Sequence, residues 1–304
     1  MKKSNLTHYL HLHFIVFIWG FTAIIGKLIS VDAIPLVWYR MLLASLFLGA
    51  YFVVKKGSFK LDSISLLKFF LSGAIISLHW ITFFKAIKVS NVSIALVMMS
   101  TGAFFTSFIE PFFFKRKIKI VEILLGLIAV GGLYIIFNFE SEYWLGIIYA
   151  LISSFLGALF SVLNGLFVRN HSASLISFYQ VLFGAICITL FLLIKGSFSP
   201  AFFKLHSRDW IFLLILSSVC TAYAFVASVK LMKYLTPYTV VLTINLEPVY
   251  AIILALIIFG ENEKMNPTFY LGAGIVLFVV FLNGTLKYMK EIIFFVEKIR
   301  RLKK

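Results

Sequence analysis

Charged residues are scarce in this chain: Asp, Glu, Lys and Arg make up only 13% of its 304 residues, about half of what soluble domains carry. Acidic residues are rarest, at 12 against 28 Lys and Arg, and the long apolar stretches contain no Asp. The chain also has no Gly-rich phosphate loop, no Gly-x-Ser-x-Gly pattern and no dense His array. It is therefore not expected to be a soluble protein, an ATP-driven pump or a membrane enzyme.

Cysteine is also rare. Cys187 and Cys220 both fall within apolar stretches, so they are interpreted as small core residues and not as a disulfide framework. His8, His11 and His13 are grouped near the N-terminus, but no carboxylate is close to them in the sequence. A metal site is not expected there, and no other cofactor is expected.

Long apolar runs dominate what remains, since 62% of the residues are hydrophobic. A helix needs about 20 apolar residues to cross a bilayer. The first run, which starts at Leu10, lacks a small-residue cleavage site and is expected to be retained as a helix. The sequence thus predicts an all-α polytopic protein embedded in a lipid bilayer. Its ten expected transmembrane helices cover residues 10–29, 35–54, 64–86, 91–114, 120–138, 144–167, 174–194, 210–230, 236–259 and 268–286.

The basic residues predict the orientation. If the N-terminus is cytoplasmic and the spans alternate, 20 Lys and Arg lie on the inner side and seven on the outer side, with Arg40 inside a span. This bias is typical of both termini in the cytoplasm, here of a bacterial multi-pass cytoplasmic membrane protein. It also explains the net charge of +16 without nucleic acid as a partner. The basic tail, 287–304, is expected to lie on the inner leaflet as an amphipathic helix.

The two halves of the chain resemble each other. Three landmarks recur at a steadily growing offset: residues 37–40 at 177–180, 85–88 at 230–233, and 126 at 272. The pattern predicts two five-helix units, 10–138 and 144–286. Because five is odd, the second unit is inverted in the membrane, and a binding site is expected between the units near the midplane.

The stretch Asn245-Leu246-Glu247-Pro248 lies near the middle of the ninth expected span. An ionised carboxylate there costs about 2.5–3.5 kcal/mol on insertion scales. Pro248 has no amide hydrogen and opposes the carbonyl of Ile244, so a bend is expected beside the acid. Such a combination is tolerated where a helix faces protein or a water-filled cavity. Glu247 is either a cavity residue that couples transport to protons or a neutral residue at a structural kink.

Several other polar or aromatic residues are candidates for the wall of this cavity. Arg40 could hold a substrate carboxylate in a bidentate fork, or extend to the outer headgroups. His79 could relay protons or be a neutral hydrogen-bonded residue, and interhelical hydrogen bonds would explain residues such as Asn164 without a ligand. The full candidate set is Trp19, Tyr39, Arg40, His79, Trp80, Tyr179, Gln180, Tyr223, Asn245 and Glu247.

A family resemblance is carried by several short motifs: Trp19-Gly20, Tyr39-Arg40, Asn91-Val92-Ser93, Leu246-Glu247-Pro248-Val249 and Phe259-Gly260-Glu261. With these motifs, residues 10–286 resemble the EamA-type branch of the drug/metabolite transporter superfamily. The resemblance implies a ten-helix exporter of small metabolites or amino acids, with a cavity lined mainly by helices 1, 3, 4, 6, 8 and 9. The family usually has a Pro and a trailing Gly-Glu in the fourth span. Here Ala103 and Lys115-Arg116 stand at these positions, so a less kinked fourth helix is expected.

The expected function is secondary transport of a small molecule by alternating access, with proton entry at Glu247 exchanged for substrate exit. A facilitative carrier without proton coupling and a non-transporting sensor or scaffold are the alternatives. The protein could also assemble as a homodimer, and the sequence does not decide its oligomeric state.

Overall fold

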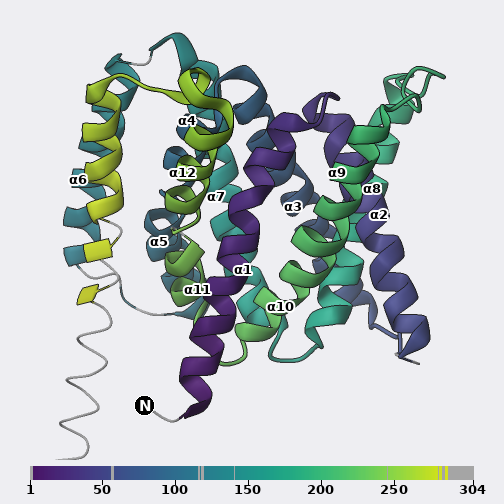
Figure 1. Cartoon of the computed structure of the whole chain (residues 1–304). Helices are drawn as coiled ribbons and strands as arrows, with labels where there is room; N and C mark the ends of the chain where they lie inside the picture. Colours follow the sequence, from purple (N-terminus) through teal and green to yellow (C-terminus); the bar gives the residue numbers. More distant parts are fainter. Residues whose placement is uncertain are drawn as a thin grey trace, which may run out of the picture.

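The computed structural model describes residues 3–55, 58–115, 117, 120–139, 141–244, 246–279, 281–282 and 285–286. Across these residues, every regular element is a helix (Figure 1). The first half contains α1 (Lys3–Leu28), α2 (Ala33–Val54), α3 (Ser63–Val89), α4 (Val92–Met99), α5 (Gly102–Phe114) and α6 (Ile120–Phe139). The second half contains η1 (Ser141–Tyr143), α7 (Trp144–Phe167), α8 (Ala173–Ile194), α9 (Ser207–Ser217), η2 (Ser218–Tyr223), α10 (Ala224–Leu231), α11 (Pro237–Ile244), α12 (Glu247–Phe259) and η3 (Gly260–Glu263).

Seven helical stretches of the described chain are long and apolar enough to cross a membrane. They cover Thr7–Leu28, Ala33–Val54, Ser63–Val89, Val92–Phe114, Ser141–Phe167, Ala173–Ile194 and Ser207–Leu231. Three apolar helices are shorter, at Leu124–Ile136, Glu247–Phe259 and Pro267–Val279. An all-helical polytopic membrane protein is therefore confirmed. The expected tail helix, 287–304, lies outside the described residues.

Polar residues mark the starts of several spans. Asp32, Asp62, Asn91 and Ser172 precede α2, α3, α4 and α8, and each accepts a hydrogen bond from a backbone N–H of the first turn. Such capping satisfies amide groups that have no partner within the helix. The caps explain why apolar runs joined by short polar connections fold into helices with well-defined ends.

The helical stretch Val92–Phe114 is interrupted between α4 and α5, although Ala103 stands where the family resemblance implies a proline. The hydroxyls of Ser100 and Thr101 donate to the carbonyls of Val97 and Met98, at 2.6 and 2.7 Å. Hydroxyl bonds back to the preceding turn bend helices. The helix is therefore interrupted just before Ala103 even without a proline at that position, and the expectation of a less kinked helix than in the family stays a prediction.

Two further spans are irregular. The stretch Ser207–Leu231 runs from α9 through the π-helix η2 into α10, and the expected span 236–259 contains two helices, α11 and α12. π-turns within α-helices are rare and often occur at functional sites. All three irregular spans supply walls of the same cavity, described below.

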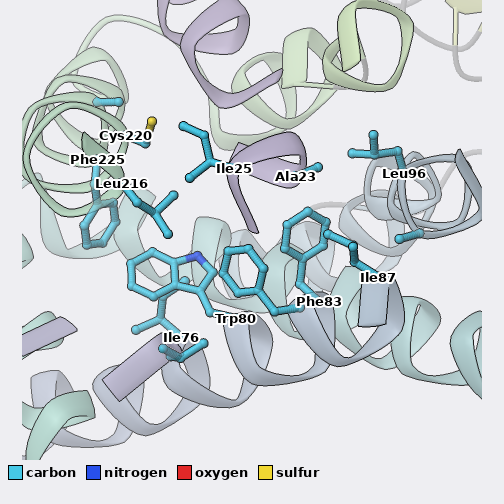
Figure 2. Close-up of a cluster of buried hydrophobic side chains, with 14 of the residues drawn as sticks. Ala23, Ile25, Ile76, Trp80, Phe83, Ile87, Leu96, Leu216, Cys220 and Phe225 are labelled. Atoms are coloured by element: carbon cyan, nitrogen blue, oxygen red, sulfur yellow. The ribbon is translucent and has the colours of Figure 1, made fainter. Parts of the chain in front are cut away.

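One continuous hydrophobic core joins both halves of the chain. The helix α3 packs against α7 and α8, while α1 packs against α12 and α10. Figure 2 shows Trp80 and Phe83 of α3 in this core, with Leu216, Cys220 and Phe225 from the α9–α10 span nearby. In Figure 1, α1 crosses the middle of the molecule, α6 lies at one edge, and α2 and α8 lie toward the other. Helices from both halves of the chain therefore pack together in the middle of the molecule.

Candidate functional site

A cavity of about 130 Å³ lies inside the helical bundle. A water molecule needs about 10–15 Å³ on the same measure, so the cavity has room for several waters or a small solute. Most of its wall is apolar or aromatic. Its polar and charged lining residues are Trp19, Thr22, Arg40, His79, Ser154, Ser161, Asn164, Ser228 and Glu247, together with the thiol of Cys220.

Arg40 supplies the positive charge of the cavity. Its side chain comes from the second turn of α2 and is only 2% exposed. Its Nε donates a 2.7 Å hydrogen bond to Oγ1 of Thr221 in the π-helix, and its guanidinium carbon lies 3.9 Å from the ring centroid of Trp80. Among the described residues, Nη1 has no hydrogen-bond partner. The guanidinium therefore faces the cavity and does not extend to the outer surface of the protein.

Glu247 is the acidic residue of the cavity wall. It is the first residue of α12 and lines the cavity. Pro248 follows in the first helical turn, where its missing N–H would have had no helical partner anyway. Arg40 and Glu247 line the same cavity, yet no ion pair within 4 Å joins them. Neither charged side chain is therefore neutralised by the other through a direct ion pair. Asn245 lies outside the described residues.

His79 is held by Ser153 of α7. The Nδ1 atom of His79 lies 2.8 Å from the carbonyl oxygen of Ser153, which can only accept, so Nδ1 carries the proton. The Ser153 hydroxyl also donates to the carbonyl of His79 at 2.8 Å. Gly157 permits this approach, since a Cβ there would come within 2.9 Å of the imidazole. The ring is fixed against the cavity wall in one tautomer.

Trp19 donates from its indole nitrogen to the carbonyl oxygen of Cys220 at 3.0 Å. That carbonyl belongs to the π-helix, so α1 and η2 are joined beside the cavity. The structure thus brings five of the sequence-derived candidates to one cavity wall: Trp19, Arg40, His79, Trp80 and Glu247.

The other described candidates lie away from the lining. The Tyr39 hydroxyl donates to Phe202 O at 3.1 Å, and the Tyr179 hydroxyl to Phe59 O at 2.7 Å. The Tyr223 hydroxyl lies 3.0 Å from the imidazole of His11. Each of these residues contacts the polypeptide and not the cavity.

Gln180 is fully buried just behind the wall. Its amide nitrogen donates to Ser72 Oγ at 2.9 Å and to Asn164 Oδ1 at 2.8 Å. Asn164 itself lines the cavity. Gln180 therefore orients a lining residue without reaching the cavity.

A polar network lies at the end of the bundle opposite the start of α1, the end that is uppermost in Figure 1. Glu263 of η3 is fully buried there. Its carboxylate accepts from the backbone N–H groups of Val92 and Ser93 and from the Ser93 hydroxyl, each at 3.1 Å, and it pairs with the ammonium of Lys27. One carboxylate thus joins the end of α1, the start of α4 and the turn after α12. We name this cluster of Lys27, Val92, Ser93 and Glu263 the upper latch.

A second set of hydrogen bonds joins α9 to the connection that follows α1. The carboxylate of Asp209 on α9 accepts from the backbone N–H of Ser30 at 2.9 Å and from its hydroxyl at 2.5 Å. Asp32, which caps α2, pairs with Lys85 at 3.3 Å. Partial burial of Asp32 opposes ionisation, but the Ala33 N–H and Lys85 outweigh it and lower the pKa of this carboxyl below its usual 3.8. The upper end is therefore held by charged contacts between helix ends.

The lower end is hollow. A depression of about 720 Å³ is lined by residues of α5, α7 and the connection from α10 to α11, including the exposed Arg169 and Tyr234. Met232 lines both this depression and the central cavity. The cavity and the lower depression thus share the side chain of Met232 as part of their walls, whereas the upper end carries the polar network.

Sequence reasoning did not single out Glu263, Thr221 or Ser153. Glu263 stands two residues beyond the motif Phe259-Gly260-Glu261, whose own acid is exposed and pairs with Lys264. Thr221 and Ser153 were visible only as hydroxyls in apolar runs. Their partners lie far away in the sequence, and the periodicity of a single helix does not contain that information.

Comparison with known proteins gives consistent results. A model of the EamA-like transporter family matches the chain twice, over residues 8–138 and 144–285. The chain is 22% identical to YxxF, an uncharacterized transporter of Bacillus subtilis, over 91% of this chain and 88% of that one. It is 26% identical to an uncharacterized transporter of Archaeoglobus fulgidus, over 89% and 94% of the two chains.

Two further matches are weaker in sequence or in extent. An uncharacterized transporter of Clostridium kluyveri is 24% identical over 60% of each chain. A crystal structure of a protein that is 14% identical superposes with a TM-score of 0.65, over 90% of this chain and 95% of that one. This second match concerns the fold alone.

Proposed function

We propose, since the chain belongs to the EamA-like transporter family, that it is a secondary transporter whose substrate site is the central cavity. The observation that carries the proposal is a buried cavity with one cationic and one acidic side chain, enclosed by three interrupted spans. Membrane transporters bind their substrates near the midplane beside such interrupted helices. The transporter names of the relatives from Bacillus and Archaeoglobus support the same function.

We also propose that the ten apolar segments form two inverted five-helix units. The two matches of the family model support this arrangement, and so does the shared cavity. In the sequence register, Gly102 of the first unit corresponds to Glu247 of the second, and both line the cavity. The interface between the units would then be the substrate site.

In alternating access, the central cavity opens to one side of the membrane at a time, so one end of the bundle is closed while the other is open. The upper latch joins helix ends at one end of the bundle, and Met232 lines both the cavity and the depression at the other end. We assign the lower end to the cytoplasm, in agreement with the basic residues near it, and the described conformation to the inward-facing side of the cycle. Export of a small metabolite or amino acid follows from this orientation as the proposed direction.

Glu247 is the proposed coupling residue. It would carry a proton in one state of the cavity and lose it in the other, so that proton entry is exchanged for substrate exit. A ligand shifts such an equilibrium only by its different affinity for the two states. Glu247 lines the cavity at the start of a helix, so its surroundings would change if the cavity opened to one side and then to the other. Its affinity for a proton would then differ between the two states, as coupling requires.

The test uses proteoliposomes loaded with amino acids and short carboxylates, with the efflux of each compound measured by mass spectrometry. An acidic exterior should drive efflux of at least one compound by the wild type. Glu247→Gln keeps the shape but cannot titrate, so it should retain efflux down the concentration gradient and lose the pH-driven part. Survival of that part in the variant would remove Glu247 as the coupling residue. Efflux without any pH-driven part in the wild type would favour a facilitative carrier, and no efflux would favour a sensor or scaffold.

A further inference from the structure

Arg40 carries a buried cation with an unsatisfied nitrogen. Its side chain is 2% exposed, and Nη1 has no hydrogen-bond partner among the described residues. Leaving a buried charged donor unpaired is costly, because the group has lost its water. A site that keeps such a donor at the wall of a cavity is suited to an anionic partner that is not part of the chain.

The protein itself does not supply this partner. Glu247 lies in the same cavity, but no ion pair within 4 Å joins it to Arg40. The Nε edge of the guanidinium is already bound to Thr221, and no carboxylate hydrogen-bonds to the guanidinium in the described part of the chain. The Nη1 nitrogen is therefore a buried donor that the protein leaves without a partner among the described residues, and a ligand oxygen that reaches it would satisfy it.

The surroundings of Arg40 fix how it is presented. Thr221 lies in the π-helix, and its hydroxyl donates to Leu216 O at 2.7 Å while accepting from Arg40 Nε. The rings of Trp80 and Phe84 lie at 3.9 and 5.6 Å from the guanidinium carbon. One edge and one face of the guanidinium are thus held, while Nη1 stays without a hydrogen-bond partner in the described part of the chain. A planar guanidinium held in this way matches the geometry of a carboxylate.

The rest of the cavity limits the ligand. Its wall includes Ile76, Phe83, Met99, Phe160, Phe225 and Ile244, which offer apolar and aromatic surface. The acidic Glu247 in the same space disfavours a ligand with two or more negative charges. A volume of about 130 Å³ limits the ligand to a small body.

We propose that Arg40, oriented by Thr221, binds the carboxylate of a small ligand that has one carboxylate and an apolar body. The proposal rests on the transport function proposed above, and it narrows the substrate to this chemical class. Phosphorylated and uncharged compounds fall outside the class. Arg40 makes the contact, and Thr221 is a positioning residue.

The experiment measures the thermal unfolding of the purified full-length protein in detergent. The probes are the proteinogenic amino acids and short monocarboxylates, each compared with its own primary amide, which keeps the shape and removes the charge. A ligand that binds the native state raises the melting temperature. At least one carboxylate should raise it while the matching amide does not.

Four variants separate recognition from structure. Arg40→Lys keeps the charge but loses the fork, and should weaken carboxylate binding about tenfold or more. Thr221→Val should reduce the preference for acid over amide, and Thr221→Ser should restore it. Arg208→Lys makes the same exchange at an exposed position of α9 and should leave the preference unchanged.

The proposal is overturned if amides or uncharged probes stabilise the protein as well as the acids, or if no acid in the panel stabilises it. It is also overturned if Arg40→Lys and Thr221→Val both keep the wild-type preference for acids. Efflux of uncharged probes from proteoliposomes would refute the carboxylate class while leaving transport itself intact. The two proposals can therefore fail separately.

Discussion

Glu263→Gln tests whether the upper latch holds the cavity closed. The wild-type carboxylate accepts three hydrogen bonds from Val92 and Ser93 and pairs with Lys27. Glutamine has one acceptor oxygen, and its NH₂ group would face N–H donors at the start of α4. The variant should therefore weaken the closed state relative to any state in which these groups are apart.

The expected size follows from the environment of the pair. Breaking a fully buried ion pair costs about 3–5 kcal/mol, but the Lys27 side chain is 27% exposed, which reduces the loss. Hydrogen bonds to charged groups contribute about 1.5–3 kcal/mol. We expect a net loss of about 2–3 kcal/mol, which shifts the ratio of closed to open molecules about 30- to 150-fold.

The native Cys220 reports the shift. Its side chain is 2% exposed and lines the cavity, so a membrane-impermeant thiol reagent added outside intact cells reaches it only when the upper end opens. With Cys187→Ala as background, Glu263→Gln should label faster by up to the same factor. Glu261→Gln is the matched control on the same turn, because that side chain is 85% exposed. Equal labelling rates for Glu263→Gln and the background, or equal acceleration by Glu261→Gln, would refute the latch.

Three further predictions concern stability and orientation. Gly157→Ala should lower the melting temperature by a destabilisation of about 1–3 kcal/mol, because the new Cβ would come within 2.9 Å of His79; unchanged unfolding would show that the ring adapts freely. Asp32→Ala should destabilise by about 1 kcal/mol at neutral pH through loss of the cap. Because the pKa of Asp32 is lowered, the wild-type advantage should persist above pH 3.8 and disappear as the pH falls through the folded-state pKa, and a pH-independent difference would contradict this. Reporter fusions should read cytoplasmic after Lys56 and Arg169 and external after Glu142, and a reversed pattern would defeat the proposed orientation.

Much of the helical fold could be predicted from the sequence, because each apolar run needs only its own length and periodicity to be recognised. An interruption beside Glu247 and Pro248 could be predicted as well, since proline acts on its own helix. The interruption at Ser100 and Thr101 could not, because these hydroxyls stabilise either a straight or a bent helix according to what surrounds them. The sequence of a segment thus predicts that it forms a helix better than it predicts where that helix is interrupted.

Some residues of the candidate site could be predicted from the sequence and others could not. Arg40, His79 and Glu247 were visible because ionisable groups are unusual in apolar runs. Tyr39 and Tyr179 were equally visible, yet their hydroxyls bind backbone carbonyls away from the cavity. The role of Thr221 depends on a π-turn that brings it to Arg40 from 181 positions away in the chain. Only the three-dimensional packing distinguishes these cases.

The central claim is that a small molecule crosses the membrane through this cavity, and a cavity-filling variant tests it most directly. A Cβ at Gly102 would meet neighbours only at 3.5 Å or more, so the backbone tolerates Gly102→Leu while the added side chain occupies the cavity. Gly131→Leu is the matched control on α6, where a Cβ would meet nothing within 4 Å.

Efflux of amino acids and short carboxylates from proteoliposomes is then compared among the wild type and both variants, after their thermal unfolding has been shown to match. The account predicts that wild type and Gly131→Leu release the same compounds at similar rates, and that Gly102→Leu releases none. Wild-type efflux by Gly102→Leu would contradict passage through this cavity.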